Sequence, residues 1–168
     1  LGIADNTIVV FFSDNGGFIN DDRIQKMQVT DNTPLRSGKG SLYEGGIREP
    51  LMVRWPGVSA AGSVCDTPVS SIDLYPTFLE MAQVNGDPDQ NVAMDGMSFA
   101  ALVKNPDAVL ERDTLFWHYP HYYATTSPVS AVRKGDWKLL RYYEDDHMEL
   151  YNLAEDLGEK NDLATAMP

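Results

Sequence analysis

Two neighbouring side chains near the N-terminus have the chemistry of metal ligands. Asp14 and Asn15 follow an unbroken apolar run at residues 8–12. A carboxylate beside an amide carbonyl offers two hard oxygen donors, which suit Ca²⁺ or Mg²⁺. Gly16 and Gly17 come next and allow the backbone to turn sharply and a ligand to approach. Because Asp, Asn and Gly are also common turn residues, an ordinary turn after a strand is the alternative.

A lysine between two glycines is the second feature with possible chemistry. Lys39 lies in the segment GKGSLYEGGIREP, residues 38–50. An ammonium on such a loop is unshielded and can act as a point charge for a phosphate or sulfate oxygen. The spacing of a P-loop is absent. A solvated surface lysine is the alternative, and Glu44, Arg48 and Glu49 are expected to form ion pairs that hold the loop.

Two histidines among aromatic residues form the third feature. His118 and His121 lie in the stretch WHYPHYY, residues 117–123. Aromatic faces stack on sugars, and histidine can donate a hydrogen bond or transfer a proton. Packing of a strand end between two domains is the alternative. A zinc site is not predicted, because no third ligand stands at a useful spacing.

The elements that position these residues fall into two groups. The run at residues 8–12 reads as a strand buried on both faces, as in a parallel sheet, with Asp14 and Asn15 at the sheet edge where ligands bind. A second short strand is predicted at residues 51–55. Helical spacing predicts a helix at residues 73–85, with Asp73 as N-cap, and a shorter one at residues 97–104.

The C-terminal part predicts a different architecture. Gly135 and Asp136 form a two-residue hairpin turn between apolar runs. The predicted strands are residues 114–119, 130–134, 137–143 and 148–153. We therefore expect an α/β domain at residues 1–112 and a small antiparallel β-sheet subdomain at residues 113–168.

Composition excludes several classes of protein. The chain of 168 residues has a net charge of -12, which argues against nucleic acid as a partner. No apolar run is long enough to span a membrane, and no signal peptide is recognisable. Cys65 is the single cysteine, so neither a disulfide framework nor a thiolate metal site is expected.

Four stretches together resemble a known family. They are TIVVFFSDNGG, PLRSGKGSLYEGGIREPLMVRWPG, SSIDLYPTFLEMA and SAVRKGDWKLLRYYEDDHMELYNLAEDLGEKNDLA. In this order they resemble the C-terminal part of the formylglycine-dependent (type I) sulfatases of the alkaline-phosphatase superfamily. The resemblance implies the C-terminal portion of an alkaline-phosphatase-like sheet domain. It also implies hydrolysis of a sulfuric ester, with a sulfated carbohydrate or another sulfated small molecule as substrate.

The resemblance also implies roles for individual residues. Asp14 and Asn15 are expected to bind Ca²⁺, with Mg²⁺ as the other possibility. Lys39 is expected to contact the substrate sulfate and to act in catalysis, and His118 and His121 to contact the substrate. A periplasmic or secreted location is expected, although the chain carries no targeting signal.

The sequence departs from the family pattern at the nucleophile. Sulfatases form formylglycine from Cys or Ser in a C/S-x-P-S-R motif, and the surroundings of Cys65 lack that proline and arginine. Two acidic metal ligands are missing as well. We therefore expect a segment of a longer protein, inactive alone, whose missing N-terminal portion is its partner. A phosphate or phosphonate ester hydrolase of the same superfamily and a non-catalytic remnant that binds glycans or a partner domain stay open.

Overall fold

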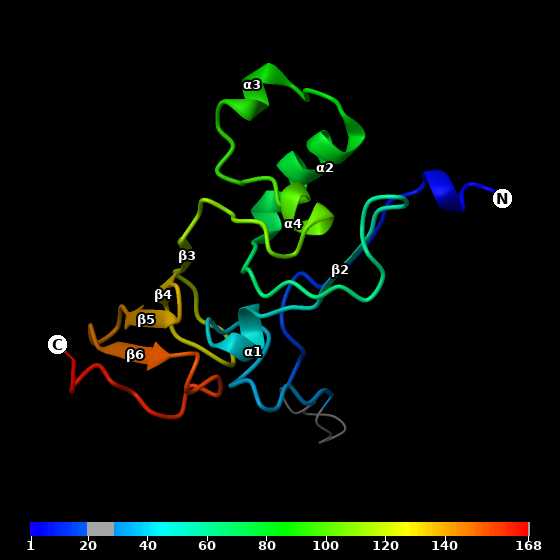
Figure 1. The fold of residues 1–168 in the computed structure, drawn as a ribbon. Helices are drawn as coiled ribbons and strands as arrows, with labels where there is room; N and C mark the ends of the chain where they lie inside the picture. The colour runs from blue at the N-terminus through cyan, green and yellow to red at the C-terminus, as the bar shows by residue number, and fades with distance from the viewer. Residues whose placement is uncertain (20–28, 168) are drawn as a thin grey trace. The chain divides into compact units, whose positions relative to one another are not determined.

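The computed structural model describes residues 1–19 and 29–167 (Figure 1). The chain divides into two compact units. The first unit contains Leu1–Phe12 and Leu51–Arg112, and the second unit contains Ser13–Pro50 and Asp113–Pro168. The predicted boundary near residue 112 is one of the points where the chain passes between units. The predicted division into domains at that point stays a prediction.

The first unit contains a two-stranded antiparallel ribbon. Strand β1 (Val9–Phe12) pairs with β2 (Leu51–Arg54), and Phe11 lies opposite Met52. Both strands were predicted, but the expected parallel neighbour of β1 is not found in the described ranges. Val9, Phe11 and Met52 are 50%, 57% and 59% exposed, so one apolar face of the ribbon is open.

The other regular elements of the first unit are short helical segments. They are η1 (Ala4–Asn6), η2 (Ser71–Asp73), α2 (Leu74–Ala82), α3 (Pro88–Asn91) and α4 (Ala100–Lys104). Helix α2 ends earlier than the predicted residue 85, because Gln83 has left-handed backbone geometry with φ 57°. Helix α4 begins later than predicted. In the segment before it, the N–H groups of Met97 and Phe99 donate to Asp73 and Thr77.

Asp73 is the polar centre of the first unit. Its carboxylate is fully buried and, instead of capping α2, accepts from Ser70 N and Met97 N at 2.7 and 2.9 Å. Arg112 donates to both of its oxygens. Burial alone would raise the pKa of Asp73, but these hydrogen bonds outweigh it and the pKa is lowered. One carboxylate therefore connects η2, the segment before α4 and the end of the unit.

The second unit is built on a four-stranded antiparallel sheet, as predicted. Its order is β3 (Thr114–Tyr119), β4 (Val129–Lys134), β5 (Trp137–Tyr142) and β6 (Met148–Asn152). The predicted turn joins β4 to β5, and Gly135 takes the positive φ of 57° that this turn needs. Leu42 and Tyr43 pack on one face of the sheet, against Val129, Ala131, Leu140, Tyr142, Tyr151 and Leu153.

A buried lysine joins three parts of the second unit. Lys138 on β5 is fully buried, and its Nζ lies 2.9 Å from Glu44 Oε1 and 2.8 Å from Glu159 Oε1. Glu44 begins the short helix α1 (Glu44–Ile47), which the sequence did not predict. Its backbone N–H donates to Glu159 Oε2 at 2.7 Å. The expected pairing of Arg48 with Glu44 is present at 3.5 Å, but Lys138 is the closer partner.

Among the described residues, no helix has both the length and the apolar character needed to cross a membrane.

We predict that Lys138→Met lowers the free energy of unfolding by about 3–5 kcal/mol, because it removes the cation of the buried Glu159 and leaves Glu44 with the more distant Arg48 and Arg133. Urea unfolding measures this change. The control is Lys134→Met, which removes a lysine whose ion pair with Asp113 is 71% exposed on both sides. That control is expected to cost no more than about 1 kcal/mol. Equal costs for the two variants would contradict a structural role of Lys138.

We predict that the stabilisation from Asp73 depends on pH. Because the folded-state pKa is lowered, the contribution is complete above the unfolded pKa of about 3.9 and is lost as the pH falls below it. The difference in unfolding free energy between the wild type and Asp73→Asn should therefore shrink between pH 7 and pH 3. Urea unfolding at both pH values tests this, with the exposed Asp66→Asn as control. A constant difference would refute it.

Candidate functional site

The proposed metal ligands lie directly after β1, where the chain enters the second unit. Asp14 is exposed and Asn15 is half-buried, and Asn15 Nδ2 donates to Asp14 Oδ1 at 2.7 Å. Gly16 N–H donates to Gly46 O at 3.0 Å. A Cβ on Gly16 would overlap Gly45 O, so this position needs glycine because it lies against α1. The turn is therefore fixed to the lysine-bearing loop.

The structure brings this turn and Lys39 together through the backbone. Lys39 N–H donates to Gly17 O at 3.1 Å. Asn32 strengthens the junction, because its Nδ2 lies within hydrogen-bond distance of Gly17 O, Ser37 O and Gly45 O, at 3.0, 3.0 and 3.3 Å. The sequence reading missed Asn32, since nothing in its local sequence indicates three partners on separate segments.

The ammonium of Lys39 is available for an anion. Lys39 is exposed, and its Nζ has no hydrogen bond or ion pair to any described residue. Lys104, Lys134 and Lys138 each reach a carboxylate. Lys160 is the other described lysine with a free ammonium. Among the described lysines, Lys39 and Lys160 are thus the two whose ammonium reaches no carboxylate.

Glu49 is a site residue that the sequence reading assigned differently. It was expected to form an ion pair within the loop, but in the described ranges it has none, and its Oε1 is buried without a hydrogen-bond partner. Burial first and the carboxylate of Asp14 second raise the pKa of Glu49 to about 7. The carboxylates of Asp14 and Glu49 are thus close enough to repel each other. No sequence motif predicts that these two carboxylates lie near each other.

The donor chemistry of this loop fits a hard divalent cation. Carboxylate and amide oxygens are the usual ligands of Ca²⁺ and Mg²⁺, and a cation would relieve both the repulsion and the unpaired oxygen of Glu49. The described part of the chain contains no group of three or more His, Cys, Asp or Glu side chains arranged to hold a metal. The residues here therefore offer part of a coordination shell.

His118 lies on the outer face of the sheet. Its neighbours Trp117 and Tyr119 pack against the core that includes Leu42 and Tyr43. Since side chains alternate along a strand, His118 points to the opposite face. There its Nδ1 lies 2.7 Å from Ser130 Oγ. No contact joins His118 to the Lys39 loop among the residues that the structure describes.

The segment that contains His121 leads to residues that contact the Lys39 loop. The exposed ring of His121 makes an edge contact with Tyr119, with centroids 5.4 Å apart. Further along, Thr125 Oγ1 donates to Lys39 O at 2.8 Å. A Cβ on Gly40, which has φ 85°, would overlap the ring of Tyr123. The sequence analysis included Tyr123 in this aromatic stretch but did not predict its packing on Gly40, and it did not identify Thr125.

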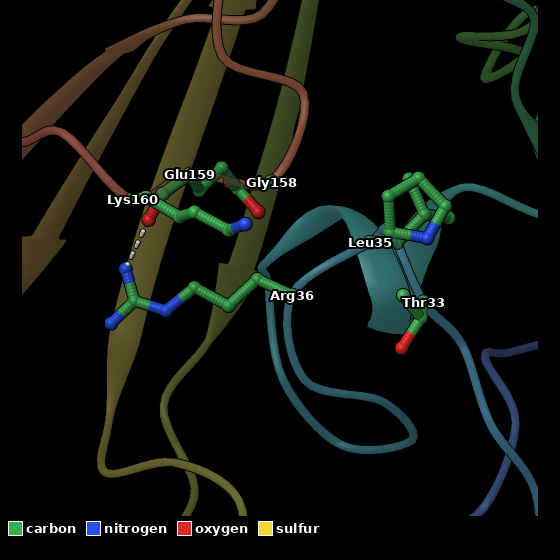
Figure 2. A pocket seen from close by; sticks show the side chains of 7 residues that line it. Thr33, Leu35, Arg36, Gly158, Glu159 and Lys160 are labelled. Atoms are coloured by element: carbon green, nitrogen blue, oxygen red, sulfur yellow. Dashed lines mark hydrogen bonds between the residues drawn. The ribbon is translucent and has the colours of Figure 1, made fainter.

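A pocket of about 570 Å³ lies beside the same loop (Figure 2). Its lining is Thr33, Pro34, Leu35, Arg36, Gly158, Glu159 and Lys160. Arg36 Nη1 donates to Glu159 O and to Tyr151 OH, each at 2.8 Å, as the dashed line shows for Glu159. The guanidinium also lies 3.8 Å from the ring centroid of Tyr43. None of the predicted site residues lines this pocket, and Arg36 is occupied by structural contacts.

Comparison with known proteins decides the family. Residues 38–167 match the family described as N-sulphoglucosamine sulphohydrolase, C-terminal. The chain belongs to the sulfatases. A sulfatase of Formosa agariphila is 42% identical over 99% of this chain and 30% of its own length. Human arylsulfatase A is 38% identical over 82% of this chain and 25% of its own length.

A solved structure agrees with this assignment. It is described as BT4656 in complex with its substrate D-glucosamine-2-N,6-O-disulfate, and it has a TM-score of 0.75 at 30% identity. The match covers 96% of this chain and 31% of that one. This sulfatase chain thus spans less than a third of the length of these three relatives.

Family membership confirms the resemblance and the alkaline-phosphatase-like fold that the sequence predicted. It implies a formylglycine nucleophile and a bound metal ion for sulfatases in general. The individual assignments of Asp14, Asn15, Lys39, His118 and His121 stay predictions.

We predict that the isolated chain binds Ca²⁺ weakly, with a Kd of about 10⁻⁴ M or higher, because the partial shell leaves most coordination positions to water. Isothermal titration calorimetry measures this binding. Asp14→Ala should abolish it, whereas the exposed Asp107→Ala should leave it unchanged. Submicromolar binding would contradict a partial coordination shell, and binding that survives Asp14→Ala would show that the ion is held elsewhere.

Proposed function

We propose that this chain is the metal- and lysine-bearing part of a sulfuric ester hydrolase. The observation that carries the proposal is the pair of backbone hydrogen bonds that join the Asp14–Asn15 turn to the Lys39 loop, from Gly16 to Gly46 and from Lys39 to Gly17. They hold the segment that carries two oxygen donors beside the loop that carries Lys39, whose ammonium has no partner among the described residues. Such a combination suits a tetrahedral oxyanion.

In this proposal Asp14 and Asn15 hold Ca²⁺, with Mg²⁺ as the alternative. A divalent ion supplies Lewis-acid stabilisation of the sulfate oxygens. Lys39 places a second positive charge where negative charge develops on the ester oxygens as the bond to sulfur breaks. Because its Nζ has no partner among the described residues, no ion pair with them has to be broken when the substrate enters.

The nucleophile is proposed to lie outside this chain. The sequence contains no C/S-x-P-S-R motif, so formylglycine and the remaining acidic ligands would come from another portion of the same protein. The isolated chain should therefore be inactive. The open apolar face formed by Val9, Phe11 and Met52 supports docking of that portion on the β1–β2 ribbon.

We propose a sulfated carbohydrate as the substrate class. Support comes from the disulfated glucosamine named for BT4656 and from the aromatic segment beside the Lys39 loop. His121 belongs to that segment and remains a proposed substrate contact. The assignment of His118 rests on the resemblance, since its contacts lie on the outer face of the sheet. We also propose a periplasmic or secreted location, where such a substrate would be encountered.

We predict that Lys39→Ala in the full-length protein lowers kcat/KM for a 6-O-sulfated glucosamine by about 10²–10³-fold, the usual cost of removing one oxyanion donor. Steady-state assay of released sulfate measures this loss. Lys160→Ala is the matched control, because it removes the other ammonium that lacks a partner among the described residues, and its activity should stay within about twofold of wild type.

Two results would redirect the proposal. Faster turnover of the corresponding phosphate ester would favour a phosphate or phosphonate hydrolase of the superfamily. Binding of the sulfated sugar without turnover by the full-length protein would identify a non-catalytic glycan-binding remnant.

A further inference from the structure

We infer that the turn at residues 123–126 positions Lys39 for sulfate binding, with Thr125 as the positioning residue. The inference rests on the proposed function, because it concerns the lysine of that same site. The turn lies 84 or more residues after Lys39 in the sequence, and nothing in the local pattern of either segment links them. Two independent contacts connect them in the structure.

The first contact is a hydrogen bond to the lysine backbone. Thr125 Oγ1 donates to Lys39 O at 2.8 Å. On the other side of the same residue, Lys39 N–H donates to Gly17 O at 3.1 Å. Both polar backbone groups of Lys39 are therefore engaged, while its side-chain ammonium has no partner in the part of the chain that the structure describes.

The second contact is packing of an aromatic ring on the next residue. The ring of Tyr123 lies so close to the α-carbon of Gly40 that a Cβ there would overlap its Cδ1, Cε1 and Cγ atoms. Gly40 also has φ 85°, a conformation that residues with a side chain rarely adopt. Glycine is thus needed at position 40 both for the backbone angle and for this ring.

The turn itself is held in one conformation. Tyr123 N–H donates to Thr126 O at 2.9 Å, and Thr126 N–H donates to Tyr123 O at 3.2 Å. This reciprocal pair closes a small antiparallel bridge. Its fixed geometry lets Thr125 and Tyr123 act together on the Lys39–Gly40 peptide.

The consequence is preorganisation of the catalytic lysine. A lysine between two glycines would otherwise sample many backbone conformations, and each one would move the ammonium. The turn removes that freedom before the substrate binds, so less entropy is lost when the sulfate is held. Loss of the Thr125 hydroxyl should therefore weaken the action of Lys39 without touching the substrate directly.

The test is Thr125→Val in the full-length protein, a change that keeps the shape and removes the donor. We expect kcat/KM for a 6-O-sulfated glucosamine to fall about 5–10-fold, with most of the loss in kcat and an unchanged melting temperature. The inhibition constant for inorganic sulfate should rise in parallel. Thr125→Ser keeps the hydroxyl and should recover activity to within about twofold.

Thr126→Val is the matched control. It makes the same change one residue later, where the hydroxyl donates to Ser127 O at 2.9 Å and not to Lys39. It should leave kcat/KM and sulfate inhibition unchanged. If Thr125→Val proves unstable, Thr125→Ser compared with Thr125→Ala in the same sulfate-inhibition assay gives the answer.

The outcomes separate this inference from the proposed function. If Lys39→Ala abolishes activity but Thr125→Val behaves like Thr126→Val, the positioning role is overturned and the function stands. If Lys39→Ala remains active, the role of Lys39 in the proposed function is overturned, and the positioning role with it. If Thr125→Val loses activity and Thr125→Ser does not recover it, a hydroxyl-mediated role is excluded.

Discussion

The second unit depends on the ion pairs of one buried ammonium. Lys138 has no exposed surface, so its charge would be very costly without the carboxylates of Glu44 and Glu159. Glu159 also accepts the backbone N–H of Glu44. Glu44 lies 94 positions before Lys138 and 115 positions before Glu159 in the sequence. These contacts hold both distant segments to strand β5. The desolvation cost of a buried ion pair offsets much of its net stabilisation. Its main effect here is to specify which segments of the chain meet.

The candidate site follows from this constraint. Glu44 is the first residue of α1, and the next residues of that helix carry the backbone bonds to both functional segments. Gly45 N–H donates to Arg36 O, and Gly46 O accepts from Gly16 N–H. With α1 fixed by Lys138, the loop before it and the turn after β1 have defined positions. Backbone hydrogen bonds thus hold the two segments of the candidate site, so the side chains of Asp14 and Lys39 are not needed to hold them together.

The sequence was sufficient for the elements whose signals are local. The strands of the C-terminal sheet and the turn at Gly135 were predicted, because alternation and turn chemistry act over a few residues. Helix α1 was missed, since a four-residue helix with two glycines has no helical pattern. Glu49, Asn32 and Thr125 were also missed as site residues. Each of these residues contacts a partner on another segment, and no sequence motif of fixed spacing contains both partners.

Electrostatics supports the proposal that a metal ion and Lys39 share one site. The chain has a net charge of -12, which repels a sulfate ester at long range. When Asp14 and Glu49 are both ionised, their two negative charges outnumber the positive charge of Lys39. Burial first, and the carboxylate of Asp14 second, raise the pKa of Glu49. A divalent cation bound there, as proposed, would reverse the sign of this small region. Metal binding and anion binding at Lys39 are therefore expected to reinforce each other.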